Sequence, residues 1–300
     1  MRYRHELPSI VAAVAVLICV APPANAEDQL EIWVSILPQH QIVQRIAGTH
    51  ARTEVLVKPG HSPATYEPTP KQMAELEGAD LLIRVGVPFE TSLLRSIEEL
   101  LPTLEIVDGR RGIDLVPMED VAPRMASNDN GNHQHGPGLP DPHFWLDPLL
   151  MKIHATTVCE VLCERAPQRA GYFQSNLAAL LDDLDQTHGR IATRLAPFAG
   201  GSIYVFHPSY GYFTRRYGLR QVAVEVGGKE PTARRLGQLV DAAAEAGVHS
   251  VFVQPQFSGN AARAVADAIG AELVELDPLA ADYFSNLDEM AEQVAAAMAE

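Results

Sequence analysis

Asp141-Pro-His-Phe-Trp-Leu-Asp-Pro148 lies near the middle of a chain of 300 residues and places one histidine between two Asp-Pro breaks. His143 follows a proline and precedes two aromatic residues, so the stretch predicts a rigid and poorly hydrated environment. An imidazole that binds a metal through one ring nitrogen needs a hydrogen-bond partner for the other, which Asp141 or Asp147 can supply. On these eight residues alone, a turn histidine without a function is an equally good interpretation.

Strand and helix patterns alternate on both sides of this stretch. Before it, β-prone runs at 29–36, 54–58, 80–85 and 104–107 are separated by helical patterns, and after it similar runs occur at 202–206, 221–225, 249–253 and 272–276. The alternation predicts α/β structure with mainly parallel sheets in two lobes. A helical pattern over 167–195 would extend for roughly 42 Å, which is long enough to join them.

The N-terminus has the pattern of an export signal. Arg2 and Arg4 precede an apolar run over 10–21, and Ala24-Asn25-Ala26 matches the small-x-small cleavage rule. The run is too short to span a membrane. Because Ile18 precedes Cys19 where lipid attachment requires a small residue, we expect a soluble periplasmic protein and not a lipoprotein.

We therefore divide the chain into a signal peptide (1–26), an N-terminal lobe (27–166), a linking helix (167–197) and a C-terminal lobe (198–300). The net charge of −15 argues against a nucleic-acid partner. Cys159 and Cys163 are four residues apart in a helical pattern, which favours two core residues, although a strained disulfide or a metal pair stays open.

Several polar residues directly follow predicted strands, where ligands bind in parallel α/β sheets. His61 follows the run at 54–58, His207 follows 202–206, and Asp277 follows 272–276. Together with His143 they form a candidate set of three nitrogens and one oxygen, which suits a borderline divalent metal such as zinc.

Enzyme motifs are missing from the sequence: there is no His-Glu-x-x-His, no Gly-x-Ser-x-Gly and no Gly-rich phosphate loop. A zinc hydrolase also needs an open coordination position and a general base, for which Glu67 and Glu225 are the candidates. Four protein ligands leave little room for a reacting water, so we expect a carrier and not an enzyme.

Over residues 30–298 the chain resembles the zinc/manganese solute-binding proteins of bacterial ABC importers. The motifs that carry the resemblance are Tyr66-Glu-Pro-Thr-Pro70, Asp141-Pro-His-Phe-Trp-Leu-Asp-Pro148, Phe206-His-Pro-Ser-Tyr-Gly-Tyr-Phe213, Gly228-Lys-Glu-Pro231, Val253-Gln-Pro-Gln-Phe-Ser258 and Leu276-Asp-Pro-Leu279. The resemblance implies two α/β lobes on a rigid backbone helix and a metal site in the cleft between them. It also implies delivery of the metal to an inner-membrane permease driven by a cytoplasmic ATPase. We expect the protein to be a monomer.

In that family the metal ligands match His143, His207 and Asp277, with a further histidine just before the Tyr-Glu-Pro motif. That position here is Ala64, and His61 on the same loop is the candidate replacement. Without His61, the site would hold two histidines and Asp277, with water or Glu225 completing it. Gln254 stands where relatives often have an acidic residue, which predicts a hydrogen-bonding role.

Zinc (Zn²⁺) is preferred to manganese (Mn²⁺) because manganese favours oxygen ligands. A manganese receptor, a siderophore or haem carrier, and a periplasmic zinc hydrolase remain the alternatives. The loop at 128–138 carries His133 and His135 among Asn, Asp and Gly. It is either an auxiliary zinc collector or a surface insertion with incidental histidines.

Overall fold

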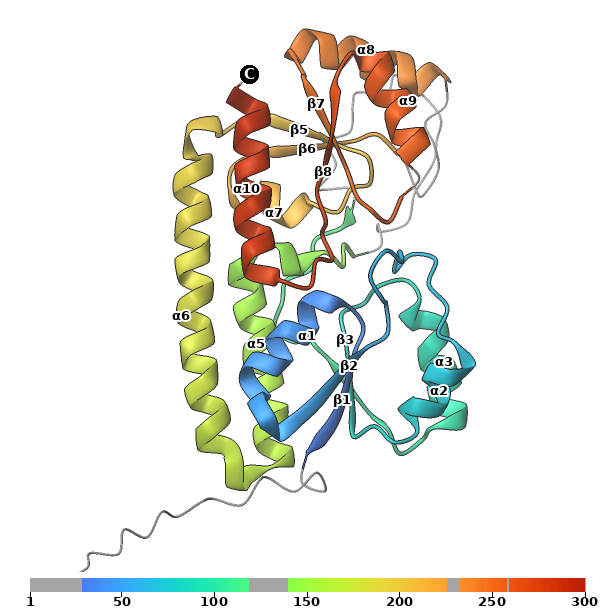
Figure 1. The fold of residues 1–300 in the computed structure, drawn as a ribbon, viewed down its shortest axis with the longest axis vertical. Coiled ribbons are helices and arrows are strands. Elements are labelled where there is room, and N and C mark those ends of the chain that lie inside the picture. The colour runs from blue at the N-terminus through green and yellow to red at the C-terminus, as the bar shows by residue number, and fades with distance from the viewer. Residues whose placement is uncertain (1–28, 119–139, 226–232, 258, 300) are drawn as a thin grey trace, which may run out of the picture.

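The computed structural model describes residues 29–118, 140–225, 233–257 and 259–299, which form two α/β lobes beside a long helix (Figure 1). The predicted signal peptide, the histidines at 133 and 135, and the motif at 228–231 lie outside these residues. No helix in the described part of the chain is long and apolar enough to cross a membrane.

Each lobe contains one four-stranded sheet in which all pairs are parallel. The N-terminal sheet has the order β2-β1-β3-β4, and the C-terminal sheet repeats it as β6-β5-β7-β8. The strands are β1 (Leu30–Val34), β2 (Ala51–Val55), β3 (Leu81–Arg84), β4 (Glu105–Asp108), β5 (Ser202–Val205), β6 (Arg220–Ala223), β7 (Ser250–Val253) and β8 (Glu272–Glu275). The expectation of two parallel-sheet lobes is confirmed.

The helices that connect these strands are α1 (Leu37–Ala47), α2 (Pro70–Leu76), α3 (Glu90–Leu100), α7 (Gly211–Arg216), α8 (Ala233–Ala246) and α9 (Gly259–Ile269). In the chain, η3 (Phe144–Leu146) and α5 (Pro148–Arg165) come between β4 and β5, and α10 (Tyr283–Ala299) is the last described helix. Three further short 3-10 turns are η2 (Gly48–His50), η4 (Pro167–Arg169) and η5 (Ala196–Phe198).

One predicted strand was displaced. The sequence pattern placed a strand at 54–58, whereas β2 is Ala51–Val55. The error arose because β2 begins with polar residues, which an edge strand tolerates on its exposed face and a search for apolar runs overlooks. The chain still follows β1 beyond β2, since Leu56 N donates to Val34 O at 2.9 Å.

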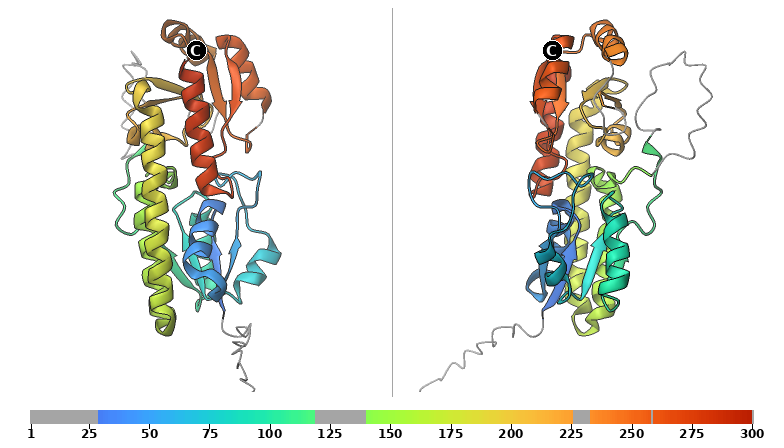
Figure 2. Two further views of the ribbon diagram at one scale, coloured as in Figure 1. Left: turned by 60° about the vertical axis from the view of Figure 1, so that its left-hand side comes forward. Right: turned by 90° about the vertical axis from the view of Figure 1, so that its right-hand side faces the viewer.

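The long helix α6 (Ala170–Leu195) packs against α5 and α1 beside the N-terminal lobe and against α10 beside the C-terminal lobe (Figures 1 and 2). Its buried positions, including Phe173, Leu184 and Ile191, belong to one apolar cluster that runs from Ile32 in the first sheet to Phe252 in the second. A continuous core of this kind resists relative movement of the lobes because close-packed interiors deform little. The predicted linking helix is therefore confirmed, although α6 begins only after η4.

Hydrogen bonds around the central motif join the lobes directly. Trp145 Nε1 donates to Pro278 O at 2.7 Å, and the Tyr283 hydroxyl donates to Trp145 O at 2.7 Å. Asp147 caps α5 by accepting from Leu149 N at 2.9 Å, and it also accepts from Arg216 Nε at 2.7 Å. The segment that carries His143 is thus fixed to both halves of the molecule.

Cys159 and Cys163 are free thiols on α5, with 3.9 Å between their sulfur atoms. Burial, together with the neighbouring thiol, raises the pKa of Cys159 to about 12. A thiol with so high a pKa is largely protonated at neutral pH and is a poor metal ligand. Their role as core residues is supported.

His154 on α5 is a buried histidine outside the cleft. Its Nδ1 donates to Gly109 O at 2.8 Å, while its Nε2 is buried without a partner in the described residues. The closeness of this ring leaves no room for a side chain at Gly109. Burial lowers the pKa of His154 from 6.5 to about 4.

This shift predicts acid lability. Between pH 6.5 and 4 the unfolded chain binds a proton that the folded chain does not, so the free energy of unfolding falls as the pH falls, by about 2 kcal/mol at pH 5. His154→Asn keeps a donor for Gly109 O but does not titrate. Urea unfolding at pH 7 and pH 5 should show a smaller loss for the variant, and equal losses in both proteins would contradict this role.

Candidate metal centre

His143 is oriented by a buried carboxylate. Asp141 has no exposed surface, and its Oδ1 accepts hydrogen bonds from His143 N at 2.9 Å and from His143 Nδ1 at 2.6 Å. The other oxygen, Oδ2, is buried and has no partner among the described residues. Because Nδ1 is bound to the carboxylate, Nε2 is left with its lone pair for a cation. Asp141, and not Asp147, is therefore the partner of His143.

His207 repeats this arrangement on the other lobe. It follows β5, and its Nδ1 is 2.5 Å from Oε1 of Glu225, which follows the neighbouring strand β6. Glu225 is almost completely buried. The side chain of Phe257 stacks on the imidazole at 4.9 Å with an interplanar angle of 28°, which fixes the plane of the ring. His207 therefore also presents Nε2.

Gln254 holds the backbone of His207. Its Nε2 donates to His207 O at 2.7 Å, and its Oε1 accepts from His207 N at 3.3 Å. The side chain is buried, so the amide is a structural brace. The hydrogen-bonding role expected for Gln254 is thus seen.

The two histidines face each other from the two lobes, with ring centroids 5.7 Å apart and planes inclined at 75°. An imidazole centroid lies about 3.2 Å from a bound zinc, so two rings sharing a tetrahedral zinc are separated by roughly 5.2 Å. The observed separation is close to this value. The buried carboxylates of Asp141 and Glu225 behind the rings favour a cation between the two histidines, because burying a charge without a counter-ion costs free energy.

His143 and His207 line one cavity of about 320 Å³. Much of its wall is apolar, and Ala64 from the loop after β2 forms part of it. The side chains of His143 and His207 are only 12% and 19% exposed, so solvent is partly displaced from the two rings. The lower local dielectric strengthens the attraction between a cation and the ring lone pairs.

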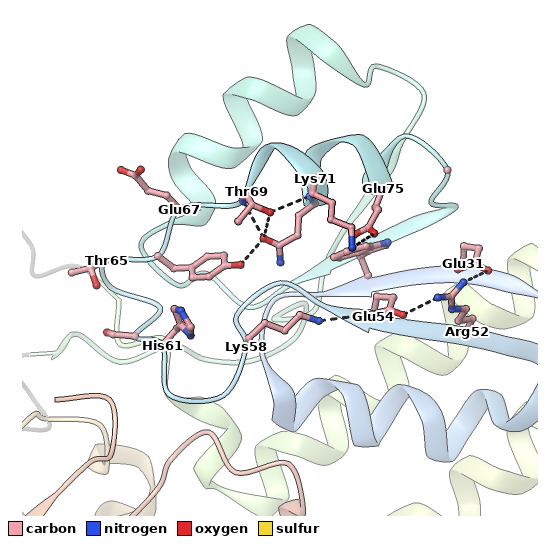
Figure 3. Close-up of a pocket in the computed structure, with 15 residues that line it drawn as sticks. Glu31, Arg52, Glu54, Lys58, His61, Thr65, Glu67, Thr69, Lys71 and Glu75 are labelled. Carbon is pink, nitrogen blue, oxygen red and sulfur yellow. Dashed lines mark hydrogen bonds and ion pairs between the residues drawn. The ribbon is translucent and has the colours of Figure 1, made fainter.

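His61 and Asp277 lie in the adjoining cavity of about 220 Å³. The exposed His61 ring also borders a larger, charged groove, where it lies with Lys58 and Thr65 at the end opposite Glu31 and Arg52 (Figure 3). Asp277 Oδ1 accepts from Gln256 Nε2 at 2.7 Å and from Leu279 N at 2.9 Å.

The structure thus arranges the four predicted ligands as two pairs. Each pair takes one residue from each lobe, and Gln256 and Leu279 line both cavities. Within the described residues no three His, Cys, Asp or Glu side chains lie close enough together to hold a metal. A shared site for all four requires both His61 and Asp277 to move toward the inner histidines.

The sequence interpretation missed the roles of two residues. It suggested Glu225 as a base or a ligand, whereas Glu225 orients His207, and it assigned no role to Gln256. Glu225 and His207 are 18 residues apart and meet only because β5 and β6 are adjacent. The Gln-Pro-Gln run after β7 was the available signal for Gln256.

Comparison with known proteins gives one family and a consistent fold. Residues 32–297 match the family described as "Zinc-uptake complex component A periplasmic" (ZnuA). The high-affinity zinc uptake system protein ZnuA of Yersinia pestis is 29% identical, with 89% of this chain and 88% of that protein covered. A putative metal-binding protein of Chlamydia muridarum is 26% identical, with 86% and 88% covered.

Two solved structures are also similar. A crystal structure of ZnuA is 37% identical with a TM-score of 0.82, covering 90% of this chain and all of that one. A zinc-bound ZnuA from which residues were deleted is 37% identical with a TM-score of 0.80, covering 90% and 98%. Both contain the two lobes described above.

The buried carboxylates generate a prediction. Asp141→Asn and Glu225→Gln each remove the charge that orients one ring, so each should weaken zinc binding by roughly 10- to 100-fold, as loss of such support does at other metal sites. Glu67→Gln is the control, because it removes the same charge from an exposed position beside the neighbouring groove. Competition titration against a chromophoric chelator measures all three. Unchanged affinity in both buried variants would show that the carboxylates do not support the centre.

Proposed function

The chain belongs to the zinc-uptake complex component A family, and from that premise we propose that it is the receptor that captures zinc for an ABC-type importer. The observation that carries the proposal is the pair of cleft histidines. Each has Nδ1 on a buried carboxylate, and their rings are 5.7 Å apart. This arrangement offers two preset nitrogen donors to one cation that joins the lobes.

We propose His143 and His207 as the inner ligands, with His61 and Asp277 completing the coordination. The position of His61 and Asp277 in the adjoining cavity supports this, since movement of the two side chains across the shared boundary would bring them toward the inner histidines. Asp277 lines the adjoining cavity, and its Oδ1 accepts hydrogen bonds from Gln256 and Leu279, so the carboxylate has to turn toward the two histidines to bind the metal. The resulting set of three nitrogens and one oxygen suits tetrahedral zinc.

The choice of zinc over manganese rests on these imidazoles. Manganese prefers carboxylate, carbonyl and water oxygens, whereas zinc accepts imidazole readily. The family name and the zinc-bound relative support the same choice. A manganese receptor is the second candidate, and it would require that most of the metal ligands be oxygens from Asp277 and water.

Transport, and not catalysis, is the role that the geometry supports. A zinc hydrolase needs a free carboxylate beside the metal as a general base. Glu225 is engaged with the His207 ring, and Glu67 is exposed on the wall of a different groove. A siderophore already coordinates its own metal, so a siderophore carrier has no need for two imidazoles preset by carboxylates.

The proposed working cycle takes place in the periplasm, after cleavage of the leader at residue 26. The monomeric receptor binds zinc in the cleft and delivers it to an inner-membrane permease. Because α6 and the shared core join the lobes, we expect small loop and side-chain movements on loading and no wide hinge closure. Release at the permease then requires only a local change at the cleft.

The ligand assignment makes a quantitative prediction. His143→Ala and His207→Ala each remove one of two preset nitrogens, so each should weaken zinc binding at least tenfold. The measurement is a competitive titration of protein freed of metal, with zinc and with manganese, and the wild type should prefer zinc. If the protein held no stoichiometric metal after zinc loading, the result would contradict the proposed function.

His61→Ala is the most informative comparison within the same series. A loss similar to that of His143→Ala would place His61 among the ligands. An unchanged affinity would leave two histidines and Asp277, with water as the fourth ligand. His50, which contacts Tyr172 on the far side of the lobe, provides the matched control His50→Ala.

A further inference from the structure

We propose that Gln256 is a latch that holds the Asp277 carboxylate away from the cavity of the two histidines. This inference rests on the proposed function, because it concerns how the fourth ligand reaches the metal. The bond between the Gln256 amide and Asp277 must break before the site is complete. Gln256 thereby lowers the apparent affinity for zinc and slows its capture.

The contact itself is short and well placed. Gln256 follows β7 by three residues, and its Nε2 donates to Asp277 Oδ1 at 2.7 Å. The same oxygen accepts from Leu279 N at 2.9 Å, so the carboxylate is turned toward its own loop. A hydrogen bond to a charged group is among the stronger ones in proteins.

Gln256 also lies on the boundary that a shared metal would occupy. It lines the cavity of His143 and His207 and, together with Leu279, the cavity of His61 and Asp277. A cation that touches Asp277 and both inner histidines must lie between these cavities. The amide therefore has to leave this boundary when the four ligands meet.

The backbone beside Asp277 cannot make the adjustment, since three side chains hold it. Asn286 Nδ2 donates to Asp277 O at 2.8 Å, Trp145 Nε1 donates to Pro278 O at 2.7 Å, and the Tyr210 hydroxyl donates to Leu276 O at 2.7 Å. Rotation of the Asp277 side chain is the movement that remains. Among the described residues, Gln256 is the side chain that opposes it.

The nearby Gln254 shows the contrast. Its amide is buried and is fixed at both ends to the backbone of His207, whereas Gln256 is partly exposed in the cleft. Gln254 therefore holds the backbone of His207 in place, whereas the side chain of Gln256 can rotate into solvent once its hydrogen bond is broken. Two glutamines two residues apart should respond to substitution in opposite directions.

Competition titration and stopped-flow capture of zinc test the latch in the full-length mature protein. Gln256→Ala should bind zinc about tenfold more tightly and faster, because a charged hydrogen bond no longer has to be broken. Gln254→Ala should bind more weakly. Gln256→Leu, which keeps the bulk but not the N–H donor, should change affinity in the same direction as Gln256→Ala.

A double variant separates a latch from a general structural effect. When Asp277→Asn is present, Gln256→Ala should give no gain, because the released side chain no longer supplies a charged ligand. Unchanged or weaker zinc binding by Gln256→Ala would overturn the latch, and so would the same gain in the Asp277→Asn background. In either case, zinc binding by the wild type would leave the proposed function intact. A wild type that binds no zinc would overturn both.

Discussion

A hydrogen bond between a buried carboxylate and the Nδ1 of a cleft histidine is the interaction on which the proposed metal centre depends. It occurs twice, at Asp141 with His143 and at Glu225 with His207. In each case the bond selects the ring nitrogen that faces the cavity and places a negative charge where water cannot solvate it. A divalent cation between the rings neutralises both charges, so the same interaction that orients the ligands also favours the cargo.

These bonds are useful only if the two lobes keep the rings at a fixed separation. The shared core along α6 provides the frame, and the bonds of Trp145 and Tyr283 hold the segment of His143 against the C-terminal lobe. The inner pair is therefore preorganised, which reduces the conformational entropy lost on binding. His61 and Asp277 lie in the adjoining cavity, where His61 is exposed and the Asp277 carboxylate is held by Gln256 and Leu279, so in the proposed site they have to move to join the pair.

The sequence was sufficient to predict the lobes, the linking helix and the meeting of His143 with His207 in one cavity, because apolar periodicity and strand ends are local features. It misplaced β2 by three residues, since an edge strand with Arg52, Thr53 and Glu54 has little apolar signal. It also could not pair His207 with Glu225 or Gln256 with Asp277, because these contacts depend on which strands are neighbours in the sheet. The position of Ala64, and not His61, beside the inner pair reflects a loop conformation that residue propensities do not determine.

Anomalous diffraction at the zinc edge from crystals of the zinc-loaded protein tests the central claim most directly. We expect one peak between the cleft histidines, about 2.0–2.1 Å from Nε2 of His143 and Nε2 of His207, with both Nδ1 atoms still on their carboxylates. A peak bound through Nδ1, a peak confined to the groove beside Lys58 and Glu54, or no ordered zinc in the cleft would contradict it.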